Sequence, residues 1–156
     1  MPKLKIRRYR KSDNETVWDL HKTGLRQNNA YILSGKWDED LDKIEKVYLK
    51  NGEFLIGEIN SKIVAMGAFK KISDEKAEIK RIRVYPEYQR KGLGQKILNK
   101  LEKRAAKMGY KILQLDTTNK QLPAQKFFEK NGYVKTKSKK FPEHNFEMIF
   151  YEKEIK

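Results

Sequence analysis

Residues 77–94 read AEIKRIRVYPEYQRKGLG, and they join a strand to the start of a helix. Apolar and charged residues alternate in the first half, and Pro86 then ends the strand. Over residues 93–108 the apolar positions recur at spacings of three and four, which predicts a helix. Gly92 and Gly94 therefore lie at the point where the chain passes from strand to helix.

The alternation inside this strand shifts by one position. Ile79 occupies an odd position, whereas Ile82 and Val84 occupy even ones, so a regular strand would place them on opposite faces. A β-bulge near Arg81 would return them to one face and bend the strand, and bulges are common beside functional sites. A strand buried on both faces explains the same pattern, and the sequence leaves both alternatives open.

The turn at residues 89–94, QRKGLG, has the features of an anion-binding site. Glycine lets the backbone approach a ligand closely, while the free N–H groups and the dipole of the first helical turn favour an anion. Arg90 and Lys91 add positive charge. The turn is not a P-loop, because no Lys-Ser/Thr pair follows the second glycine, and it lacks the third glycine of a dinucleotide fingerprint. We predict a cradle for a diphosphate.

Positive charge is concentrated around this turn. The chain has 36 Lys and Arg against 21 Asp and Glu, a formal net charge of +15. Residues 80–111 hold eleven basic and two acidic residues, which is +9 of that total. Such a field attracts nucleic acid, an anionic membrane surface or a phosphate-rich cofactor. A solvated helix face explains several of these lysines but not the glycines.

Length and composition exclude several classes of protein. The 156 residues predict one domain over 1–156, and the absence of cysteine excludes disulfides, thiol nucleophiles and thiolate metal sites. The two histidines, His21 and His144, are too few and too far apart for a typical zinc site, so we expect no metal. No apolar run approaches the ~20 residues of a membrane span, and the start of the chain has no signal-peptide core. We expect a cytoplasmic protein with no membrane partner.

The remaining periodicities predict an α/β fold with an α+β-like mixed sheet. Its order, β-α-α-β-β-β-α-β-α-β-β, predicts a largely antiparallel sheet of six to seven strands, helices on both faces and one β-α-β crossover. Strands are expected at 4–9, 54–59, 62–70, 77–85, 112–116, 133–137 and 146–152, and helices after Ser12 or Asp13, at 41–48, at 93–108 and at 124–130.

Two of these segments resemble a known family. Residues 77–94 closely resemble the acetyl-CoA motif of the GNAT superfamily of N-acetyltransferases, and residues 124–133, AQKFFEKNGY, resemble its second cofactor motif. The order of elements also matches, so the resemblance covers nearly the whole chain, although the first sixty residues match only in pattern. It implies the GNAT fold, with a bulged central strand splayed from its neighbour, and an N-acetyltransferase that uses acetyl-CoA.

The resemblance also implies a set of cofactor contacts. The pantetheine arm of acetyl-CoA would pair like an added strand with the backbone of Ile82 and Val84, and the diphosphate would lie on the amides of residues 90–95. Gln121 stands where the family often has a cofactor-binding asparagine, and Asn119 is the alternative. The expected set is Ile82, Arg83, Val84, Gln89, Arg90, Lys91, Gly92, Leu93, Gly94, Gln95, Asn119, Gln121, Phe127 and Phe128.

The implied reaction is direct transfer of acetyl to a primary amine in a ternary complex. Because such an amine is mostly protonated at neutral pH, a carboxylate that accepts its proton is useful. Glu78 is our candidate, with Glu58 and Asp116 as alternatives, and a surface ion pair is the other explanation of Glu78. A backbone N–H of the bulged strand would stabilise the developing oxyanion.

One position departs from the family. Phe128 replaces a tyrosine whose hydroxyl protonates the departing CoA thiolate in many members. Tyr133 and Tyr151 are candidates for that role, and we choose Tyr133; solvent is the alternative. The departure also keeps open a CoA-binding sensor with little catalysis.

The acceptor and the partners are less defined. Trp18, Leu25, Tyr31, Trp37 and Tyr48 are expected on the acceptor side. A protein N-terminus, an amino acid or a small amine is compatible with the sequence, whereas the net positive charge disfavours a polyamine. The alternative function is a basic nucleic-acid- or ribosome-associated module, which the dispersed charge and the lack of binding motifs disfavour. We expect no specific nucleic acid, and a homodimer is an open alternative because dimers are common in the family.

Overall fold

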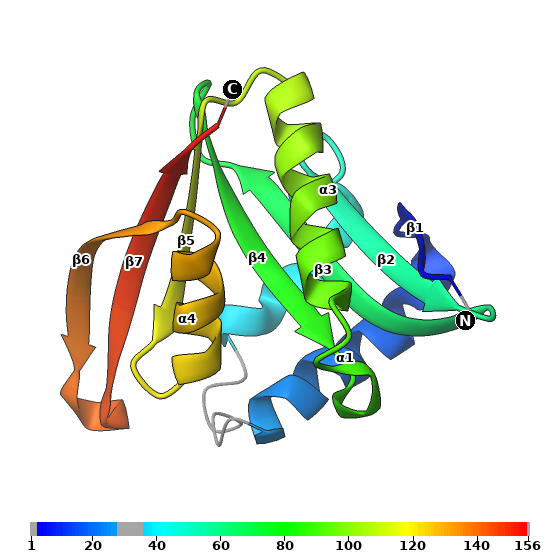
Figure 1. The fold of residues 1–156 in the computed structure, drawn as a ribbon, viewed down its shortest axis with the longest axis horizontal. Helices are drawn as coiled ribbons and strands as arrows, with labels where there is room; N and C mark the ends of the chain where they lie inside the picture. The colour runs from blue at the N-terminus through cyan, green and yellow to red at the C-terminus, as the bar shows by residue number, and fades with distance from the viewer. Residues whose placement is uncertain (1–2, 28–35, 156) are drawn as a thin grey trace.

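A computed structural model describes residues 3–27 and 36–155 of the chain. One sheet of seven strands runs through it in the order β1-β2-β3-β4-β5-β7-β6 (Figure 1). All neighbours are antiparallel except β4 and β5, which are parallel and joined by the crossover helix α3. The strands are β1 (Lys5–Arg8), β2 (Glu53–Ile59), β3 (Lys62–Lys71), β4 (Lys76–Val84), β5 (Ile112–Thr118), β6 (Val134–Phe141) and β7 (Phe146–Glu154).

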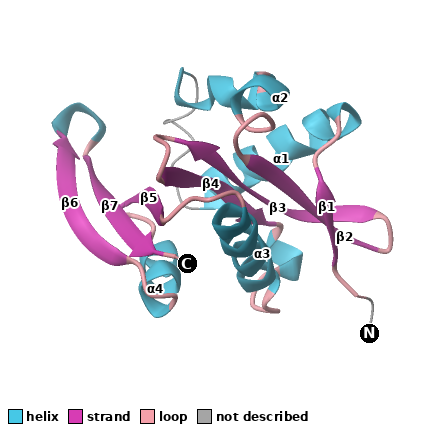
Figure 2. Ribbon diagram, turned by 90° about the horizontal axis from the view of Figure 1, so that it is seen from above, coloured by secondary structure: helices cyan, strands magenta, loops and turns pink. Residues whose placement is uncertain are grey.

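Helices cover both faces of the sheet, as expected (Figure 2). The α-helices are α1 (Asn14–Gln27), α2 (Ile44–Val47), α3 (Leu93–Lys107) and α4 (Leu122–Lys130); the 3-10 segments are η1 (Lys11–Asp13), η3 (Lys36–Asp42), η4 (Pro86–Tyr88) and η5 (Pro142–His144). One core cluster, which includes Ile97 and Leu101, lies between α3 and the sheet. The other, which includes Val17 and Leu20, lies between α1 and the opposite face. The burial of these apolar stripes holds the helices in place.

A β-bulge interrupts β4. This was one of the two explanations of the shifted apolar pattern in this strand. Lys80 opposes Ala68 and Arg83 opposes Met66, so two residues of β4 face the single residue Gly67 between them. Arg81 has a φ of +64°, in the left-handed region. Ile79, Ile82 and Val84 consequently all pack on the α3 side. The alternative, burial on both faces, also holds in part, because Glu78 on the other face of β4 is only 8% exposed.

The two parallel strands separate soon after they meet. β4 pairs with β5 only from Lys76 to Glu78, opposite Ile112–Gln114. β5 continues along β7 as far as Thr118, whereas β4 runs away from it toward the start of α3 (Figure 1). The expected splay is therefore present, and its apex is at Glu78.

Several boundaries differ from the sequence-based expectations. The second helix is shorter than 41–48, because a 3-10 segment occupies residues 36–42 before it. β6 extends to Phe141, beyond the expected end at 137, and seven of its eight residues are exposed. An exposed strand has no buried face and therefore needs no alternation of apolar and polar residues. The sequence pattern that would mark its end is consequently weak. Among the described residues, no helix is both long enough and apolar enough to span a membrane.

Candidate active site

The turn between β4 and α3 forms a bare backbone surface at a helix N-terminus. Arg90 and Gly92 have φ values of +63° and +79°, and Gly92 is the N-cap of α3. A Cβ on Gly92 would meet nothing within 4 Å, and one on Gly94 would only touch Val84 at 3.8 Å. The glycines thus leave open the space in front of the first-turn N–H groups, and that turn holds no acidic residue to compete for them.

The open half of β4 turns backbone groups toward the splay. The Tyr85 N–H donates to the Val64 carbonyl on β3 at 2.9 Å, so alternation directs the backbone groups of Ile82 and Val84 the other way. The Gln89 side chain donates to the Val84 carbonyl at 2.8 Å and exchanges amide hydrogen bonds with Gln27 of α1. Gln89 therefore braces the turn, beside an edge to which an extended ligand can pair.

Two carboxyl groups meet at the apex of the splay. Glu78 is 8% exposed, and the Asp116 carboxyl on β5 lies near enough to interact with it electrostatically. Burial raises the pKa of Glu78, and Asp116 raises it further, while Lys80 and Lys70 oppose the shift. The Glu78 carboxyl therefore binds a proton more readily than an ordinary glutamate. Glu58 lies elsewhere, paired with Arg7 at 2.9 Å.

An ionic network beneath the bulge was absent from the sequence-based expectations. Arg81 donates to both carboxylate oxygens of Asp40, at 2.5 and 3.1 Å, and lies 3.4 Å from Asp38. The Tyr48 hydroxyl also donates to Asp40, and His21 Nε2 lies 2.8 Å from Asp38. Burial, with Arg81 nearby, lowers the pKa of His21 to about 4. The network holds the left-handed residue of β4 by its side chain.

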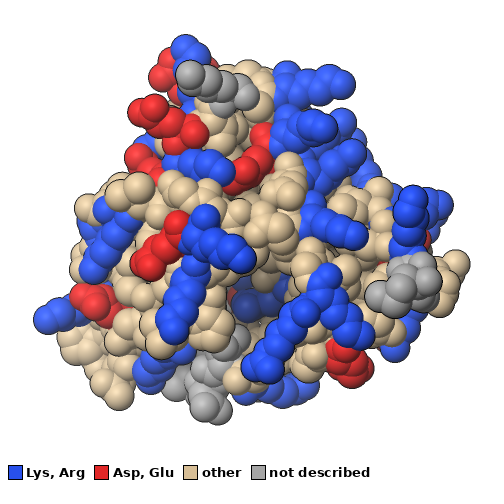
Figure 3. Space-filling model, in the orientation of Figure 1, with Lys and Arg blue, Asp and Glu red and all other residues tan. Residues whose placement is uncertain are grey.

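The molecular surface is hollowed on the face that carries this turn. Figure 3 shows a depression near the middle of the molecule, with Lys and Arg atoms on its floor and around its rim. In the same orientation, the splay between β4 and β5 and the N-terminal end of α3 lie in this region (Figure 1). The open edge of β4, the bare N-terminus of α3 and the positive charge thus lie on one face of the molecule.

The model of the family described as "Acetyltransferase (GNAT) family" matches residues 14–133, which is most of the chain. The chain belongs to this GNAT acetyltransferase family. No curated protein sequence matches it significantly.

Solved structures agree with the family assignment at the level of the fold. A GNAT-family acetyltransferase from Staphylococcus aureus Mu50 is 22% identical, with a TM-score of 0.88 over 99% of this chain and 100% of that one. A GNAT acetyltransferase from Elizabethkingia anophelis with acetyl-CoA bound is also 22% identical, with a TM-score of 0.76 over 97% and 98%. The PaiA N-acetyltransferase of Thermoplasma acidophilum, in complex with coenzyme A, has 22% identity and a TM-score of 0.78 over 97% and 99%.

The aromatic residues of this GNAT chain serve packing. Phe128 is 8% exposed, and its ring lies 5.2 Å from that of Phe127 and 5.6 Å from that of Tyr133. The Tyr133 hydroxyl donates to Glu102 of α3 at 2.7 Å, and burial together with Glu102 raises the pKa of Tyr133. The acid role of Tyr133 stays a prediction, and its bond to Glu102 argues against that role.

The alternative acid is also engaged. The Tyr151 hydroxyl donates to Glu129 of α4 at 2.8 Å, and burial and that carboxylate raise its pKa to about 12. Both tyrosines thus attach the far strands of the sheet to helices.

Amide side chains connect the two cofactor motifs. Gln95 of α3 and Asn131, at the end of α4, exchange hydrogen bonds of 2.7 and 3.0 Å. The Asn119 side chain accepts from the Glu147 N–H at 2.9 Å, which holds it to β7. The Gln121 side chain accepts a long hydrogen bond, 3.3 Å, from the Thr117 hydroxyl. Of the two expected amide contacts, Gln121 is the less constrained.

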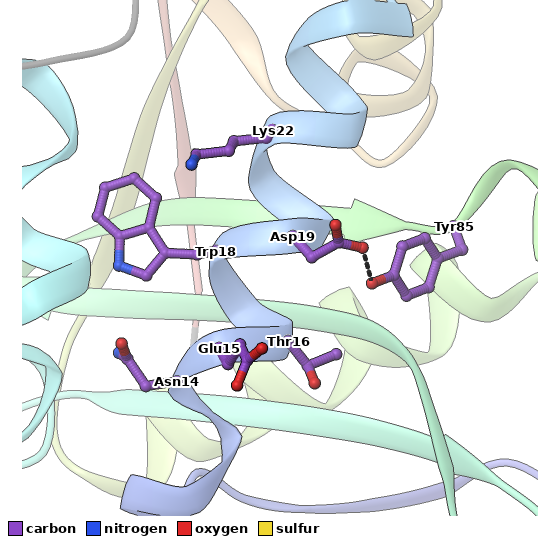
Figure 4. Close-up of a pocket in the computed structure, with 7 residues that line it drawn as sticks. All are labelled: Asn14, Glu15, Thr16, Trp18, Asp19, Lys22 and Tyr85. Atoms are coloured by element: carbon purple, nitrogen blue, oxygen red, sulfur yellow. Dashed lines mark hydrogen bonds between the residues drawn. The ribbon is translucent and has the colours of Figure 1, made fainter.

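A shallow groove of about 620 Å³ lies along α1 (Figure 4). Tyr85 donates to Asp19 at 2.5 Å across it, and Lys22 lies 5.6 Å from the Trp18 ring. The groove is lined by Asn14, Glu15, Thr16, Trp18, Asp19, Lys22 and Tyr85.

Other residues expected on the acceptor side have different environments. Leu25 is buried and Tyr48 is fully buried, so both contribute to packing. Tyr31 and the side chain of Trp37 lie outside the described residues, as does the His144 side chain.

Proposed function

We propose that this GNAT acetyltransferase transfers an acetyl group from acetyl-CoA to a primary amine by direct attack in a ternary complex. The observation that carries the proposal is the path of β4. After Glu78 the strand has an open edge, and that edge leads into the bare N-terminus of α3. An extended arm with a diphosphate at one end fits such a surface, because strand edges bind extended chains and helix N-termini bind phosphates.

The proposed binding residues follow from this path. The amides of residues 90–95, with the Arg90 and Lys91 side chains, would hold the diphosphate. The backbone of Ile82 and Val84 would pair with the pantetheine arm, with Gln121 and Phe127 nearby. When bound, acetyl-CoA supplies an activated acyl group as a thioester. The Elizabethkingia and Thermoplasma structures, which hold acetyl-CoA and coenzyme A, support this assignment.

Glu78 is the proposed general base. Its raised pKa suits a group that takes a proton from an ammonium near neutral pH, directly or through water. Asp116 keeps that pKa high and orients the carboxyl. The N–H of Ile82 or Val84 would donate to the carbonyl oxygen as negative charge develops on it.

Departure of the thiolate is proposed to need no protein acid. Phe128 has no hydroxyl, and the Tyr133 and Tyr151 hydroxyls are bonded to Glu102 and Glu129. A thiol with a pKa of about 8.5 leaves readily as the thiolate, so solvent suffices.

Calorimetric titration tests the proposal. Acetyl-CoA is titrated at moderate salt, with dephospho-CoA and a short DNA duplex as comparators, and thiol release is then followed with a panel of amines. Micromolar binding of acetyl-CoA, with DNA binding that salt abolishes, is expected. Salt-resistant DNA binding without acetyl-CoA binding would favour the nucleic-acid module. Tight acetyl-CoA binding without release of thiol in any condition would favour a sensor.

A further inference from the structure

Arg83 makes no ion pair with any residue that the structure describes. It lies on the open half of β4, and its side chain extends under the sheet against α1. Its Nε is buried and makes no hydrogen bond to any group in residues 3–27 and 36–155. Two positions earlier, Arg81 is bound by both oxygens of Asp40. Buried donors without partners are rare in proteins, so this one needs an explanation.

Gly24 provides the space in which Arg83 lies. A Cβ at Gly24 would be 2.8 Å from Cδ of Arg83 and 3.1 Å from its Nε, so any other residue would displace the side chain. Gly24 is inside α1, where a glycine costs about 1 kcal/mol relative to alanine. Gly24 thus lowers the stability of α1 at the position where the Arg83 side chain packs against it.

Arg83 is desolvated and lies near a second cation, Arg81. Burial and, to a smaller extent, Arg81 lower the pKa of Arg83 to about 10, opposed by Asp38, so the group remains a cation at neutral pH. His21 Nδ1, on the same side of α1, is also buried without a hydrogen-bond partner among the described residues. A desolvated cation next to another cation is unfavourable, and an incoming anion relieves that cost while accepting charge-assisted hydrogen bonds.

We propose that Arg83 binds the anionic group, a carboxylate or a phosphate, of an acceptor that also carries the reactive amine. The inference rests on the proposed function and names its substrate class. Arg83 and Glu78 lie on the same face of β4, since Ala77, Ile79 and Ile82 fill the opposite face. Arg83 is partly exposed as a residue, although its Nε is buried. One small acceptor would then lie along this face of β4, with its amine at the apex near Glu78 and its anionic group at Arg83.

Side-chain NMR tests the inference without turnover. Labelled protein is saturated with CoA, which fills the diphosphate site, and the Arg83 Nε–H signal is assigned by its loss in Arg83→Lys. Sodium acetate and sodium phosphate are titrated separately against sodium chloride at equal ionic strength. We expect acetate or phosphate to move this signal saturably at millimolar concentration, and the tighter anion identifies the group. A shift equal to that in chloride, or equal to that of the other arginines, would overturn the proposal.

Acceptor kinetics give the second test. L-amino acids are compared with their amides, which keep the amine and lose the anion, in wild type, Arg83→Gln and Lys22→Gln. Arg83→Gln should raise the KM of the acids at least tenfold and that of the amides less than twofold. Lys22→Gln removes a charge from the same helix region and should change neither. Equal losses for acids and amides would mean that Arg83 is structural.

The two tests separate the two proposals. If acetyl-CoA does not bind by calorimetry, the proposed function fails, and the anion titration of Arg83 is then run without CoA and still decides the inference. If acetyl-CoA binds but no amino acid is acetylated, the NMR titration alone decides it.

Discussion

The two halves of β4 differ in what holds them. From Lys76 to Glu78 the strand has a neighbour on each side, β3 and β5, and its backbone is satisfied within the sheet. After Glu78 it pairs with β3 alone, and side-chain contacts help to fix its conformation, with Arg81 bound to Asp40. A strand can thus leave one edge free for a ligand if ion pairs fix the conformation that the missing neighbour would have fixed.

This comparison implies that the network beneath the open half is structural. Arg81→Met should therefore destabilise the fold strongly, because it leaves the Asp40 and Asp38 carboxylates without their cation in a buried site. We expect a loss of about 3 to 5 kcal/mol in the free energy of unfolding, measured by urea denaturation. Lys111→Gln, which breaks an exposed pair with Glu75, is the control and should cost about 0.5 kcal/mol or less. A loss below about 1 kcal/mol for Arg81→Met would show that the bulge is held by other contacts.

The open half should lose its ligand when the adjoining turn is blocked. Gly92→Glu places a negative side chain in front of the first turn of α3, and we expect acetyl-CoA affinity to fall at least about a hundredfold. Gly109→Glu is the matched control, because Gly109 also has a positive φ, +98°, also has open space at its Cβ position, and follows the other end of α3. Both variants carry a similar backbone strain of about 1 to 2 kcal/mol. Calorimetry should find normal affinity in Gly109→Glu; equal affinities in the two variants would remove the turn from the binding site.

Glu78, at the apex between the two halves of β4, should affect kcat rather than the affinity for acetyl-CoA. Glu78→Gln keeps the shape and hydrogen-bonding capacity of the side chain but accepts no proton, so kcat should fall roughly 30- to 100-fold with acetyl-CoA affinity nearly unchanged. The acidic limb of the kcat/KM profile against pH, which the proposed mechanism assigns to Glu78, should disappear in the variant. Glu58→Gln, a carboxylate paired with Arg7, is the control. Full activity of Glu78→Gln across pH would exclude Glu78 as the base.

Acid should weaken the network beneath the open half. His21 has a folded-state pKa of about 4, below the ordinary value of 6.5, so the unfolded chain binds a proton that the folded chain excludes between these pH values. Stability is therefore lost as the pH falls from 6.5 toward 4, by about 2 kcal/mol at pH 5 from this group. His21→Gln should flatten that part of the profile of unfolding free energy against pH. An unchanged slope would show that His21 is charged in the folded state.

The sequence predicted the parts of this molecule that depend on neighbouring residues. The phase shift of apolar residues along one strand indicated a bulge near Arg81 as one of two alternatives, and the glycines between a strand and a helix predicted the turn at Gly92. Both are local consequences of backbone geometry. The family resemblance added the splay between β4 and β5. No local pattern indicates it, because it depends on where the pairing of these two strands ends.

The contacts that the sequence did not predict join distant segments. Asp38 and Asp40 come about forty residues before Arg81, and the acidic run in which they lie looks like any solvated surface. Gly24 gave no signal either, since its reason is the Arg83 side chain of another element. The partners of Tyr133 and Tyr151 are of the same kind, because a hydroxyl on a strand and a carboxylate on a helix carry no mark of their pairing.

The outer strand β6 limits how copies of this protein can meet. A strand at the border of a sheet offers unpaired backbone groups to any other chain, and charged side chains are the common protection against such pairing. β6 is exposed along nearly its whole length, and Lys135, Lys137, Lys139 and Lys140 repeat along it. Two such borders brought together would face each other with like charges. A second copy that docks on this protein would therefore not continue the sheet past β6.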